Sequence, residues 1–424
     1  MAGTVHIVGA GLGGLSAAVD LTDAGYKDIR FYEAAKAAGG RCRSFVDTVL
    51  NITVDNGSHL LLSGNWAAVR YLKKIDGLKE MTQCEAEIPF ADLASGERWT
   101  LRPNSSRVPW WILDTKRRVP GSKPTDYLAP LGLLRAINQS KLVGEVMNTK
   151  TSLYERLWRP VMLAALNVEP AEADAQMAIT LFKETFGGGG AACKPIIAHQ
   201  GMSSAYIDPA IKYLTARGAS FSYGRTLRGV DYDGQRAAAL DFGDEKIVVG
   251  PDDIVILAAP PVVARSYVPG LITPEKFKAI VNVHFKIAPP AGHPMYLGVV
   301  NSITEWLFSY EDHMSVTISA ADEWMHHDRE DLARKVWAEV SKITGLPEEL
   351  PPWQINRERR ATFAAIPSEA KKRPGPKTQF GNLFLAGDWT ATGLPACMEG
   401  AVRSGNAAAR AVLETAQATS GAAA

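Results

Sequence analysis

Three glycines near the N-terminus constrain the fold of this chain more than any other feature. They have the spacing GxGxxG and are Gly9, Gly11 and Gly14. An apolar strand is predicted before them and a small-residue helix at 16–24 after them, and a second apolar run at 29–32 ends at Glu33. This order of strand, glycine turn, helix, strand and acid is typical of a dinucleotide-binding Rossmann unit. The sequence therefore predicts an α/β fold that binds a dinucleotide.

Each residue of this motif has an expected physical role. The first glycine allows the tight turn, the second lets the backbone approach a pyrophosphate, and the third lets the helix pack on the strand. The helix N-terminus faces the phosphate charge, and Glu33 is expected to accept hydrogen bonds from the ribose hydroxyls. The predicted phosphate-binding residues are Gly9, Gly11, Leu12, Gly13 and Gly14.

A second glycine loop separates FAD from NAD. Six residues after Glu33 the chain reads Gly39-Gly40-Arg41. In FAD proteins that resemble amine oxidases and phytoene desaturases, a loop of this type lies along the flavin diphosphate, and nicotinamide dehydrogenases have none. The resemblance implies FAD as the cofactor, with Gly40 and Arg41 beside its diphosphate. Taken alone, the loop could also be a solvated turn.

Composition and charge exclude several other functions. The chain has 424 residues and a net charge of +1, which suits two or three globular domains and argues against general nucleic-acid binding. Its four cysteines lack metal or disulfide spacing, so we expect a reducing compartment and no metal centre. No run of about eighteen apolar residues exists, and the N-terminus leads directly into the first predicted strand, so we expect neither a membrane span nor a secretory signal.

Two titratable residues lie four positions apart in the segment Asp55-Asn56-Gly57-Ser58-His59, which follows a strand predicted at 48–54. A carboxylate can set the tautomer of an imidazole and raise its pKa, so Asp55 and His59 form a candidate acid site over a flavin. Alternatively, Asp55 caps a turn and His59 is a hydrogen-bonded histidine beside the cofactor. Gly57 lets the backbone pass close to a flat group, and both Gly57 and Ser58 are predicted to contact the cofactor.

The segment 102–141 differs in character from the rest of the chain. It contains eight Lys or Arg against two Asp, a local excess of six positive charges. Trp110, Trp111 and a leucine cluster at 131–134 are interleaved with the cations and broken by prolines. This pattern indicates an interfacial segment on an anionic membrane surface, and the alternative is a cap domain with a solvated basic face. With the first interpretation, we expect a cytoplasmic protein that associates peripherally with the inner membrane.

The later segments alternate between two predicted domains. A helix at 206–217 and the strands that follow it return to the dinucleotide domain, and in FAD proteins of this kind the backbone near Leu227 lies beside the adenine. The Rossmann-type domain is therefore discontinuous, and an α+β substrate domain is inserted into it. The FAD-binding domain is assigned to 1–75, 195–262 and 376–424, and the substrate and membrane-facing domain to 76–194 and 263–375.

A second cofactor motif follows a strand predicted at 382–386. It begins with Gly387-Asp388 and continues into a small-residue helix that starts near Met398. In this superfamily the aspartate binds a ribityl hydroxyl or a water on the pyrophosphate, and the helix N-terminus stabilises the anionic reduced flavin. The predicted contacts of this motif are Gly387, Asp388, Pro395, Ala396 and Met398.

Three segments resemble hydroxysqualene dehydroxylases, which are FAD-dependent desaturase-like proteins of hopanoid synthesis. They are DNGSHLLL at 55–62, LWRPVMLAALN at 157–167 and GDWTATGLPACMEGAVRSG at 387–405. The similarity spans nearly the whole chain, and it departs from the family pattern at the sulfur pair Cys397-Met398 and in the basic insert around Trp110. The resemblance implies that hydroxysqualene, an allylic alcohol, is reduced to squalene with loss of water.

This reaction needs a proton for the leaving hydroxyl, a dry apolar site and a hydride from reduced flavin. We expect His59, oriented by Asp55, to donate the proton. Glu399 ranks second, because the dipole at the start of the final helix lowers its pKa and disfavours proton donation. The implied partners are an apolar isoprenoid substrate and pathway neighbours that resemble a squalene synthase and a squalene cyclase.

Three other functions stay open. A carotenoid or phytoene desaturase shares the fold and an apolar substrate but runs oxidatively, and TGLPACMEG lacks the HPGGGIPG-type stretch that is usual there. An amine oxidase would carry a flavin-flanking aromatic residue where Leu394, Pro395 and Ala396 stand. A non-catalytic flavin protein that delivers squalene to a cyclase would share every binding motif and lack only the acid.

Overall fold

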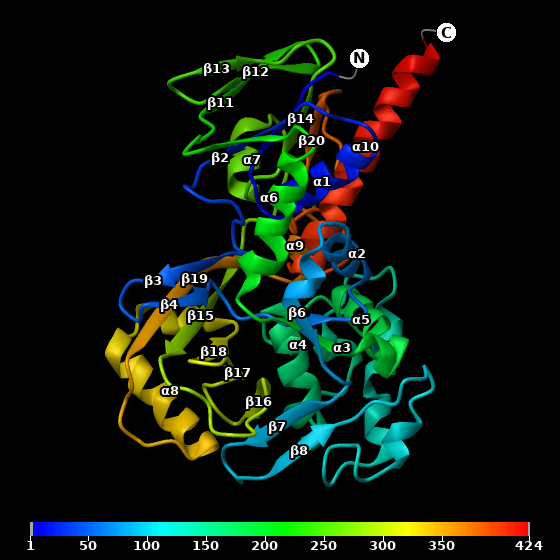
Figure 1. Cartoon of the computed structure of the whole chain (residues 1–424). Helices are drawn as coiled ribbons and strands as arrows, with labels where there is room; N and C mark the ends of the chain where they lie inside the picture. The colour runs from blue at the N-terminus through cyan, green and yellow to red at the C-terminus, as the bar shows by residue number, and fades with distance from the viewer. Residues whose placement is uncertain (1–2, 423–424) are drawn as a thin grey trace.

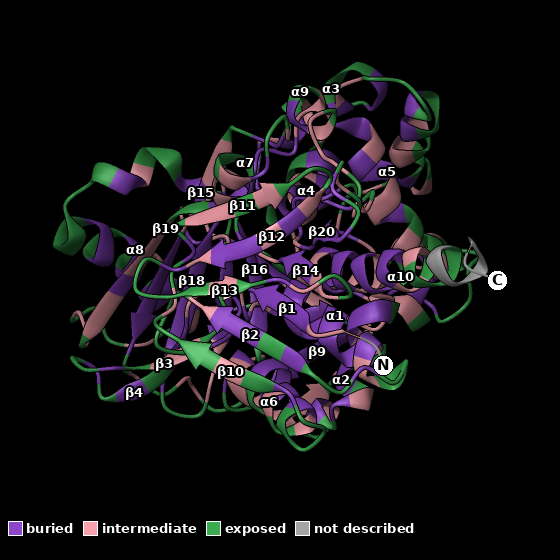
Figure 2. Ribbon diagram, turned by 90° about the horizontal axis from the view of Figure 1, so that it is seen from above, coloured by how far each residue is buried: buried purple, intermediate pink, exposed green. Residues whose placement is uncertain are grey.

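The computed structural model describes residues 3–422 and has two lobes (Figure 1). The upper lobe in Figure 1 is built on a five-stranded sheet whose pairings are all parallel. In spatial order its strands are β10 (Ser220–Tyr223), β2 (Ile29–Glu33), β1 (Val5–Val8), β14 (Ile254–Leu257) and β20 (Leu383–Leu385). The central strands are continuous apolar runs because both faces of a parallel sheet are covered, and Figure 2 shows β1 and β14 buried.

Two helices from opposite ends of the chain pack against each other beside this sheet, α1 (Leu12–Asp23) and α10 (Met398–Ala422). A Cβ at Gly405 of α10 would collide with the Ser16 hydroxyl and with the carbonyl of Gly13 on α1, so this glycine permits the close approach of the two backbones. The other elements of the upper lobe are α6 (Asp208–Thr215), α7 (Pro261–Tyr267) and the antiparallel strands β11 (Gly229–Asp233), β12 (Arg236–Asp241) and β13 (Lys246–Val248).

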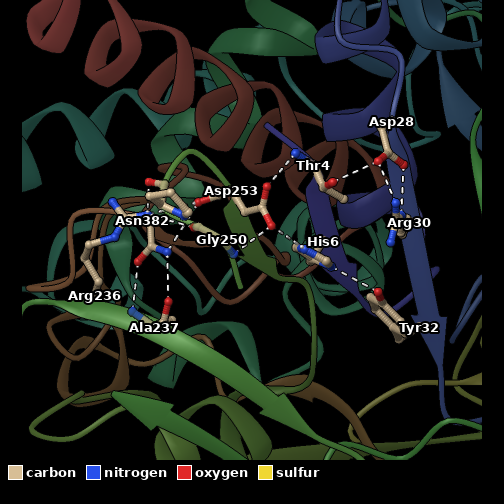
Figure 3. Close-up of polar contacts among 11 residues, drawn as sticks. Thr4, His6, Asp28, Arg30, Tyr32, Arg236, Ala237, Gly250, Asp253 and Asn382 are labelled. Atoms are coloured by element: carbon tan, nitrogen blue, oxygen red, sulfur yellow. Dashed lines mark hydrogen bonds and ion pairs between the residues drawn. The ribbon is translucent and has the colours of Figure 1, made fainter. Parts of the chain in front are cut away.

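Buried polar side chains join the antiparallel strands to the parallel sheet (Figure 3). The Asn382 amide pairs with the backbone N–H and carbonyl of Ala237 on β12 at 2.9 and 3.0 Å. Asp253, just before β14, accepts hydrogen bonds from the Thr4 N–H at 2.7 Å and lies 3.3 Å from His6 Nε2. Burial lowers the pKa of His6. These contacts satisfy polar groups that would otherwise be costly inside the lobe.

The lower lobe is built on a seven-stranded mixed sheet. Its order is β19 (Trp353–Phe363), β15 (Phe277–Phe285), β18 (Met314–Ile318), β17 (Trp306–Ser309), β16 (Tyr296–Val300), β7 (Ile88–Asp92) and β8 (Arg98–Leu101). Helix α8 (Arg329–Thr344) covers one face, where Val336 and Trp337 pack in one apolar cluster with Phe285. The opposite face carries Trp306 and Phe308, which belong to a separate cluster with the helical segments.

The remaining elements are shorter. They are the strands β5 (Leu61–Leu62), β9 (Pro195–Ala198) and β6 (Met81–Gln83), which form a small antiparallel sheet, and the helices α2 (Trp66–Lys74), α3 (Val143–Val146), α4 (Arg159–Leu166), α5 (Ala175–Glu184) and α9 (Pro367–Ala370). Residues 102–141 contain only short 3₁₀ segments, at Trp110–Leu113 and Pro124–Ala136.

The strand predicted at 48–54 is present only in its second half, because residues 48–51 form a turn. Strands β3 (Ser44–Asp47) and β4 (Ile52–Asp55) instead form an antiparallel hairpin. The turn between them is held by the Asp47 carboxylate, which accepts hydrogen bonds from the Val49 and Leu50 N–H groups at 2.9 and 2.8 Å. Asn51 takes a left-handed conformation with φ 51°, which asparagine tolerates better than most residues.

The predicted α/β fold class is confirmed. The parallel sheet draws strands from all three segments assigned to the FAD-binding domain, and the seven-stranded sheet draws strands from both segments assigned to the substrate domain. Within residues 3–422, no helix is long and apolar enough to cross a membrane.

Candidate functional site

The two glycine motifs predicted to bind the cofactor meet, although they lie more than 370 residues apart in the sequence. A Cβ at Gly13, in the first turn of α1, would come within 3.1 Å of the Gly387 N at the end of β20. β1 and β20 flank β14, so both motifs lie at the carboxyl ends of neighbouring parallel strands. This edge is where open α/β sheets bind their ligands.

The start of α1 is open to a ligand. A Cβ at Gly11 would find no atom closer than the Gly39 carbonyl oxygen at 4.0 Å. Gly11 caps the helix without a side-chain hydrogen bond, and the first turn contains no acidic residue. The first N–H groups of the helix are therefore free to bind an anion. The Gly39-Gly40 loop lies directly beside this turn, since Gly11 and Gly39 form an isolated bridge.

Glu33 lies at the end of β2, next to the glycine turn. Its carboxylate accepts hydrogen bonds from the Ala10 N–H at 2.8 Å and from the Ala35 N–H at 2.9 Å. The segment before Leu227 returns to the same place, because the Arg225 N–H donates to the Glu33 carbonyl at 2.8 Å. Leu227 is buried, and its carbonyl accepts a hydrogen bond from the Tyr267 hydroxyl. The residues predicted to hold the adenosine are thus brought together.

Arg41 and Asp388 form an ion pair between the two motifs. Arg41 Nη2 lies 2.6 Å from Asp388 Oδ1, and Arg41 Nη1 donates to the Ala361 carbonyl at 2.5 Å. The Asp388 carboxylate is almost fully buried, whereas 46% of the Arg41 side chain is exposed. The neighbouring carboxylate raises the pKa of the Arg41 guanidinium despite the opposing effect of burial. A fixed positive charge therefore stands beside the open turn of α1.

Arg373 was missed by the sequence analysis, although it organises the loop after Asp388. Its guanidinium donates hydrogen bonds to backbone carbonyls of that loop, at 2.7 Å to Leu394 and 3.2 Å to Asp388, and also to the carbonyl of Thr390. Burial lowers the pKa of Arg373 to about 10. Because it stands in the stretch KKRPGPK, the sequence alone gives it the pattern of a surface cation.

The expected pairing of Asp55 with His59 is not found. One Asp55 oxygen accepts hydrogen bonds from the Ser44 hydroxyl at 2.6 Å and the Met202 N–H at 2.8 Å, and no hydrogen bond joins the Asp55 carboxylate to His59 within residues 3–422. β4 ends at Asp55, whose side chain is buried, whereas His59 lies beyond the strand end and is exposed.

Within residues 3–422, His59 forms no ion pair with a carboxylate. His59 is exposed at the surface. Desolvation by the surrounding protein and the nearby positive charge of Arg41 nevertheless lower the pKa of its imidazole to about 4. The expected upward shift of this pKa is therefore wrong, and the imidazole is neutral at pH 7. Ser58 is buried and accepts a hydrogen bond from the Tyr310 hydroxyl at 3.1 Å.

The hydrogen-bond partners of Glu399 give its carboxylate a structural role. Its carboxylate accepts hydrogen bonds from the Ala67 and Ala68 N–H groups at 3.1 and 2.8 Å, and from Arg403 Nε at 2.6 Å. It thereby caps the start of α2 and joins that helix to α10. This geometry disfavours Glu399 as a proton donor.

Three remaining predicted contacts lie where the chain enters α10: Pro395 and Ala396 precede the helix, and Met398 is its first residue. Pro395 is buried and Ala396 half-buried, and the Met398 sulfur lies 3.9 Å from the Cys42 sulfur. Burial raises the pKa of the neighbouring Cys397 thiol to about 12. The segment before α10 is therefore uncharged, and the first turn of α10 follows it directly.

The polar side chains of the lower sheet that face the 55–59 segment were not predicted. The Asn282 amide donates to the Asn56 carbonyl at 3.2 Å and accepts from the Thr317 hydroxyl at 2.8 Å. Behind them His284 is fully buried, and its ring nitrogens lie 2.7 Å from the Ser315 hydroxyl and 3.3 Å from the Asn356 amide. Their signal in the sequence is weak, because single polar residues in apolar strands have no fixed spacing.

Glu305 is a second unpredicted titratable group. It immediately precedes β17, and its Oε2 accepts a hydrogen bond from the Ser319 N–H at 2.7 Å. Burial raises the pKa of Glu305 to about 7, and the positive charge of Arg159 on α4 opposes that shift. Met162 of α4 belongs to the apolar cluster of Trp306, so α4 lies on the side of the sheet away from α8.

Together these features fit a flavin dinucleotide. The uncapped helix start and Arg41 suit a diphosphate, and Glu33 retains free lone pairs for ribose hydroxyls. The family model for flavin containing amine oxidoreductases matches residues 12–288 and 298–413. The hydroxysqualene dehydroxylase of Rhodopseudomonas palustris is 48% identical over 415 residues, which cover 97% of this chain and 99% of that protein.

The chain belongs to the hydroxysqualene dehydroxylase family of flavin-containing amine oxidoreductases. A member from Sinorhizobium fredii is also 48% identical, over 96% of this chain and 97% of its own. Among solved structures, cyclohexylamine oxidase from Brevibacterium oxydans superposes with a TM-score of 0.69 at 16% identity, covering 98% of this chain and 100% of that one. That likeness concerns the fold alone. The predicted cofactor, FAD, is confirmed by the family.

Proposed function

We propose that this enzyme reduces hydroxysqualene to squalene with loss of water. The observation that carries the proposal is the 48% identity to a hydroxysqualene dehydroxylase over 97% of this chain. Bound FAD, once reduced by a donor outside this chain, supplies the hydride. The allylic C–O bond breaks as a proton joins the hydroxyl oxygen to form water, and the hydride forms the new C–H bond. Two electrons and two protons are consumed in each turnover.

The residues of the chain hold and isolate these reactants. The glycine turn, Arg41 and the loop held by Arg373 fix the dinucleotide at the edge of the parallel sheet. Trp158 lies edge-on to Phe182 and Phe186 in the helical segments, which gives the lower lobe an aromatic interior. An apolar interior excludes water, which would otherwise capture an allylic cation.

Two groups are candidates for the proton donor, and their pKa values separate them. His59, the candidate from the sequence, has a pKa of about 4 and carries no proton to donate at pH 7. Glu305 has a pKa of about 7, so a substantial fraction of this carboxyl group is protonated at pH 7. The Ser319 N–H binds its Oε2 and not its Oε1. The positive charge of Arg159 acts on Glu305, and α4, which carries Arg159, lies on the inner side of the sheet; this supports a place for Glu305 near that side. We therefore favour Glu305.

The test is an anaerobic single turnover. The purified yellow protein is reduced, hydroxysqualene is added in detergent, and flavin reoxidation is followed at its visible band while squalene is extracted. Reoxidation matched mole for mole by squalene is the expected result. A flavin that stays reduced while the alcohol is recovered intact would overturn the proposal. Oxidised protein that dehydrogenates an isoprenoid would indicate a desaturase, and a flavin inert in both assays would indicate a carrier.

We also propose that the segment 102–141 attaches the enzyme to a membrane surface, from which it takes its apolar substrate. Support comes from seven exposed large apolar side chains, here called the apolar ridge, while the rest of the described chain exposes seven others. The ridge consists of Val108, Trp110, Leu113, Leu128, Leu131, Leu134 and Ile137. Exposed apolar groups gathered in one segment are typical of an interaction surface.

A further inference from the structure

A basic groove lies between the β7–β8 hairpin and the chain at 115–120. Its volume is about 520 Å³, and its lining includes four cations and no carboxylate. Two of the cations, Arg98 and Arg102, come from the two ends of β8, and the other two, Lys116 and Arg118, come from the loop opposite. Positive groups from two separate segments therefore converge on one concave space.

Most of this charge is not neutralised within the protein. Arg118 donates to the Ile112 carbonyl at 3.1 Å and Arg98 donates to the Ile343 carbonyl in the last turn of α8, and neither forms an ion pair within residues 3–422. The Lys116 ammonium has no hydrogen-bond or ion-pair partner within residues 3–422. Arg102 alone has an acidic neighbour, Glu87, with 3.0 Å between Nε and Oε1. Concentrated positive charge of this kind, without a protein counter-ion, is suited to a bound anion.

The remaining lining defines the kind of anion. Phe90, Trp99 and Pro294 give the groove apolar walls beside its cations. A guanidinium presents parallel N–H donors that match two oxygens of a phosphate. A ligand with a phosphate and an attached apolar body would satisfy both parts of the groove, whereas a small free anion would leave the walls in contact with water.

The loop that lines the groove directly follows one end of the apolar ridge in the sequence. Only Asp114 separates Leu113 of the ridge from Thr115 of the groove lining, and the Arg117 guanidinium stacks 4.8 Å from the centre of the Trp110 ring. The β7–β8 hairpin and this segment lie at the end of the molecule opposite to β11–β13 (Figure 1). Cations beside exposed tryptophan and leucine form the arrangement that binds headgroups and acyl chains together.

We propose that the basic groove binds the phosphate of an anionic phospholipid while the apolar ridge enters the acyl layer next to it. The site rests on the membrane attachment proposed above, and it makes that attachment specific for a phosphate held at one position. General attraction between the segment 102–141 and a negative surface would depend only on the number of cations. A defined groove depends on which cations are removed.

The experiment compares two double variants that lose the same charge. Lys116→Gln with Arg118→Gln removes two groove cations, and Arg107→Gln with Arg135→Gln removes two cations of the same segment that do not line the groove. Arg107 and Arg135 are exposed, and neither has an ion-pair partner within the described residues. Glutamine keeps a hydrogen-bond donor at each position, and thermal melting verifies that both proteins fold.

Binding of the flavin-loaded protein is measured by co-sedimentation with vesicles of phosphatidylcholine alone or with about 30% phosphatidylglycerol added as the anionic phospholipid. We expect the groove variant to lose at least tenfold more affinity for the anionic vesicles than the control variant, and Lys116→Arg with Arg118→Lys to stay within about threefold of the parent. Equal losses in the two glutamine variants would overturn the proposal.

Two further measurements distinguish lipid phosphate from free phosphate, and the lipid-binding proposal from the proposed reaction. Inorganic phosphate at 10 mM should leave vesicle binding nearly unchanged, and complete competition by it would show a free-anion site and overturn the lipid assignment. The vesicle assay contains no isoprenoid and the single-turnover assay contains no phospholipid. A protein that binds anionic vesicles through the groove and forms no squalene would contradict only the proposed reaction.

Discussion

Ionisable groups have opposite surroundings in two regions of the molecule. One is the edge of the parallel sheet where the two glycine motifs meet, here called the cofactor edge, and the other is the face of the lower sheet away from α8, here called the inner face. At the cofactor edge, charged groups have partners: Arg41 is paired with Asp388, and Glu33 is bound by two N–H groups. Within residues 3–422, neither His284 on the inner face nor Glu305 just before β17 forms an ion pair, and burial shifts the pKa of each toward its neutral form. Paired charges fix a bound cofactor in place, whereas a neutral acid can release a proton during a reaction.

The largest expected effect would decide whether the inner face supplies the proton. Glu305→Gln should slow squalene formation in a single turnover by about 100-fold to 10,000-fold, which is the range for loss of a general acid. In the parent enzyme the same rate should fall about tenfold per pH unit above pH 7, because the carboxyl of pKa about 7 loses its proton there.

Two matched variants sharpen that result. Glu311→Gln, which changes an exposed carboxylate on the same sheet, should leave the rate unchanged. His59→Gln should retain the pH dependence above 7. If His59→Gln abolishes squalene formation and Glu305→Gln does not, the sequence-based choice of donor is right and the neutral state of His59 is no obstacle.

A second prediction contrasts two glycines of the cofactor edge. A Cβ at Gly14 would collide with the Gly9 carbonyl oxygen, whereas a Cβ at Gly11 finds open space. Gly11→Ala should therefore melt like the parent without FAD and lose FAD affinity by about tenfold to 100-fold, because the methyl group occupies space needed by the phosphate. Gly14→Ala should lower the melting temperature of the FAD-free protein as well. Melting curves and flavin retained after gel filtration measure both effects, and equal melting of the two variants would contradict the geometry.

These glycines also show where sequence reasoning succeeds. The turn between β1 and α1 is determined by neighbouring residues, so GxGxxG predicts both its shape and its ligand. Arg373 acts on carbonyls fifteen or more positions away and Asn282 acts on Asn56, so only the folded chain reveals their roles. The predicted pairing of Asp55 with His59 was wrong, because spacing in the sequence does not determine which side chains meet in the folded chain. A spacing of four suggests contact, but a strand end separates them.

A third prediction addresses the loop that follows Asp388. Arg373→Gln removes a buried cation that donates to several loop carbonyls, so we expect a loss of about 2–3 kcal/mol in the free energy of unfolding, with weaker FAD binding. Lys371→Gln changes an exposed cation two residues away and should change stability by less than about 0.5 kcal/mol. Urea unfolding of the FAD-free proteins measures both. Equal stability of the two variants would show that the loop does not depend on this guanidinium.

The smallest expected effect concerns stability in acid and tests the neutral character of the inner face. His284 is fully buried, and burial lowers its pKa to about 3, while the unfolded chain binds a proton below pH 6.5. Because the unfolded state binds more protons, the stability contributed by neutral His284 is complete above pH 6.5 and declines as the pH falls toward 3. Between pH 6.5 and 5 this amounts to about 2 kcal/mol, at about 1.36 kcal/mol per pH unit.

The prediction is measured as a slope, which separates titration from packing. His284→Gln should be less stable than the parent at pH 7, because it disturbs the hydrogen bonds to Ser315 and Asn356. When the pH is lowered to 5, however, its free energy of unfolding should fall by about 2 kcal/mol less than that of the parent. His326→Gln, which changes an exposed histidine outside the inner face, is the control, and its acid slope should match the parent. Parallel slopes for parent and His284→Gln would mean that His284 takes up its proton in the folded state, and that the inner face tolerates charge as the cofactor edge does.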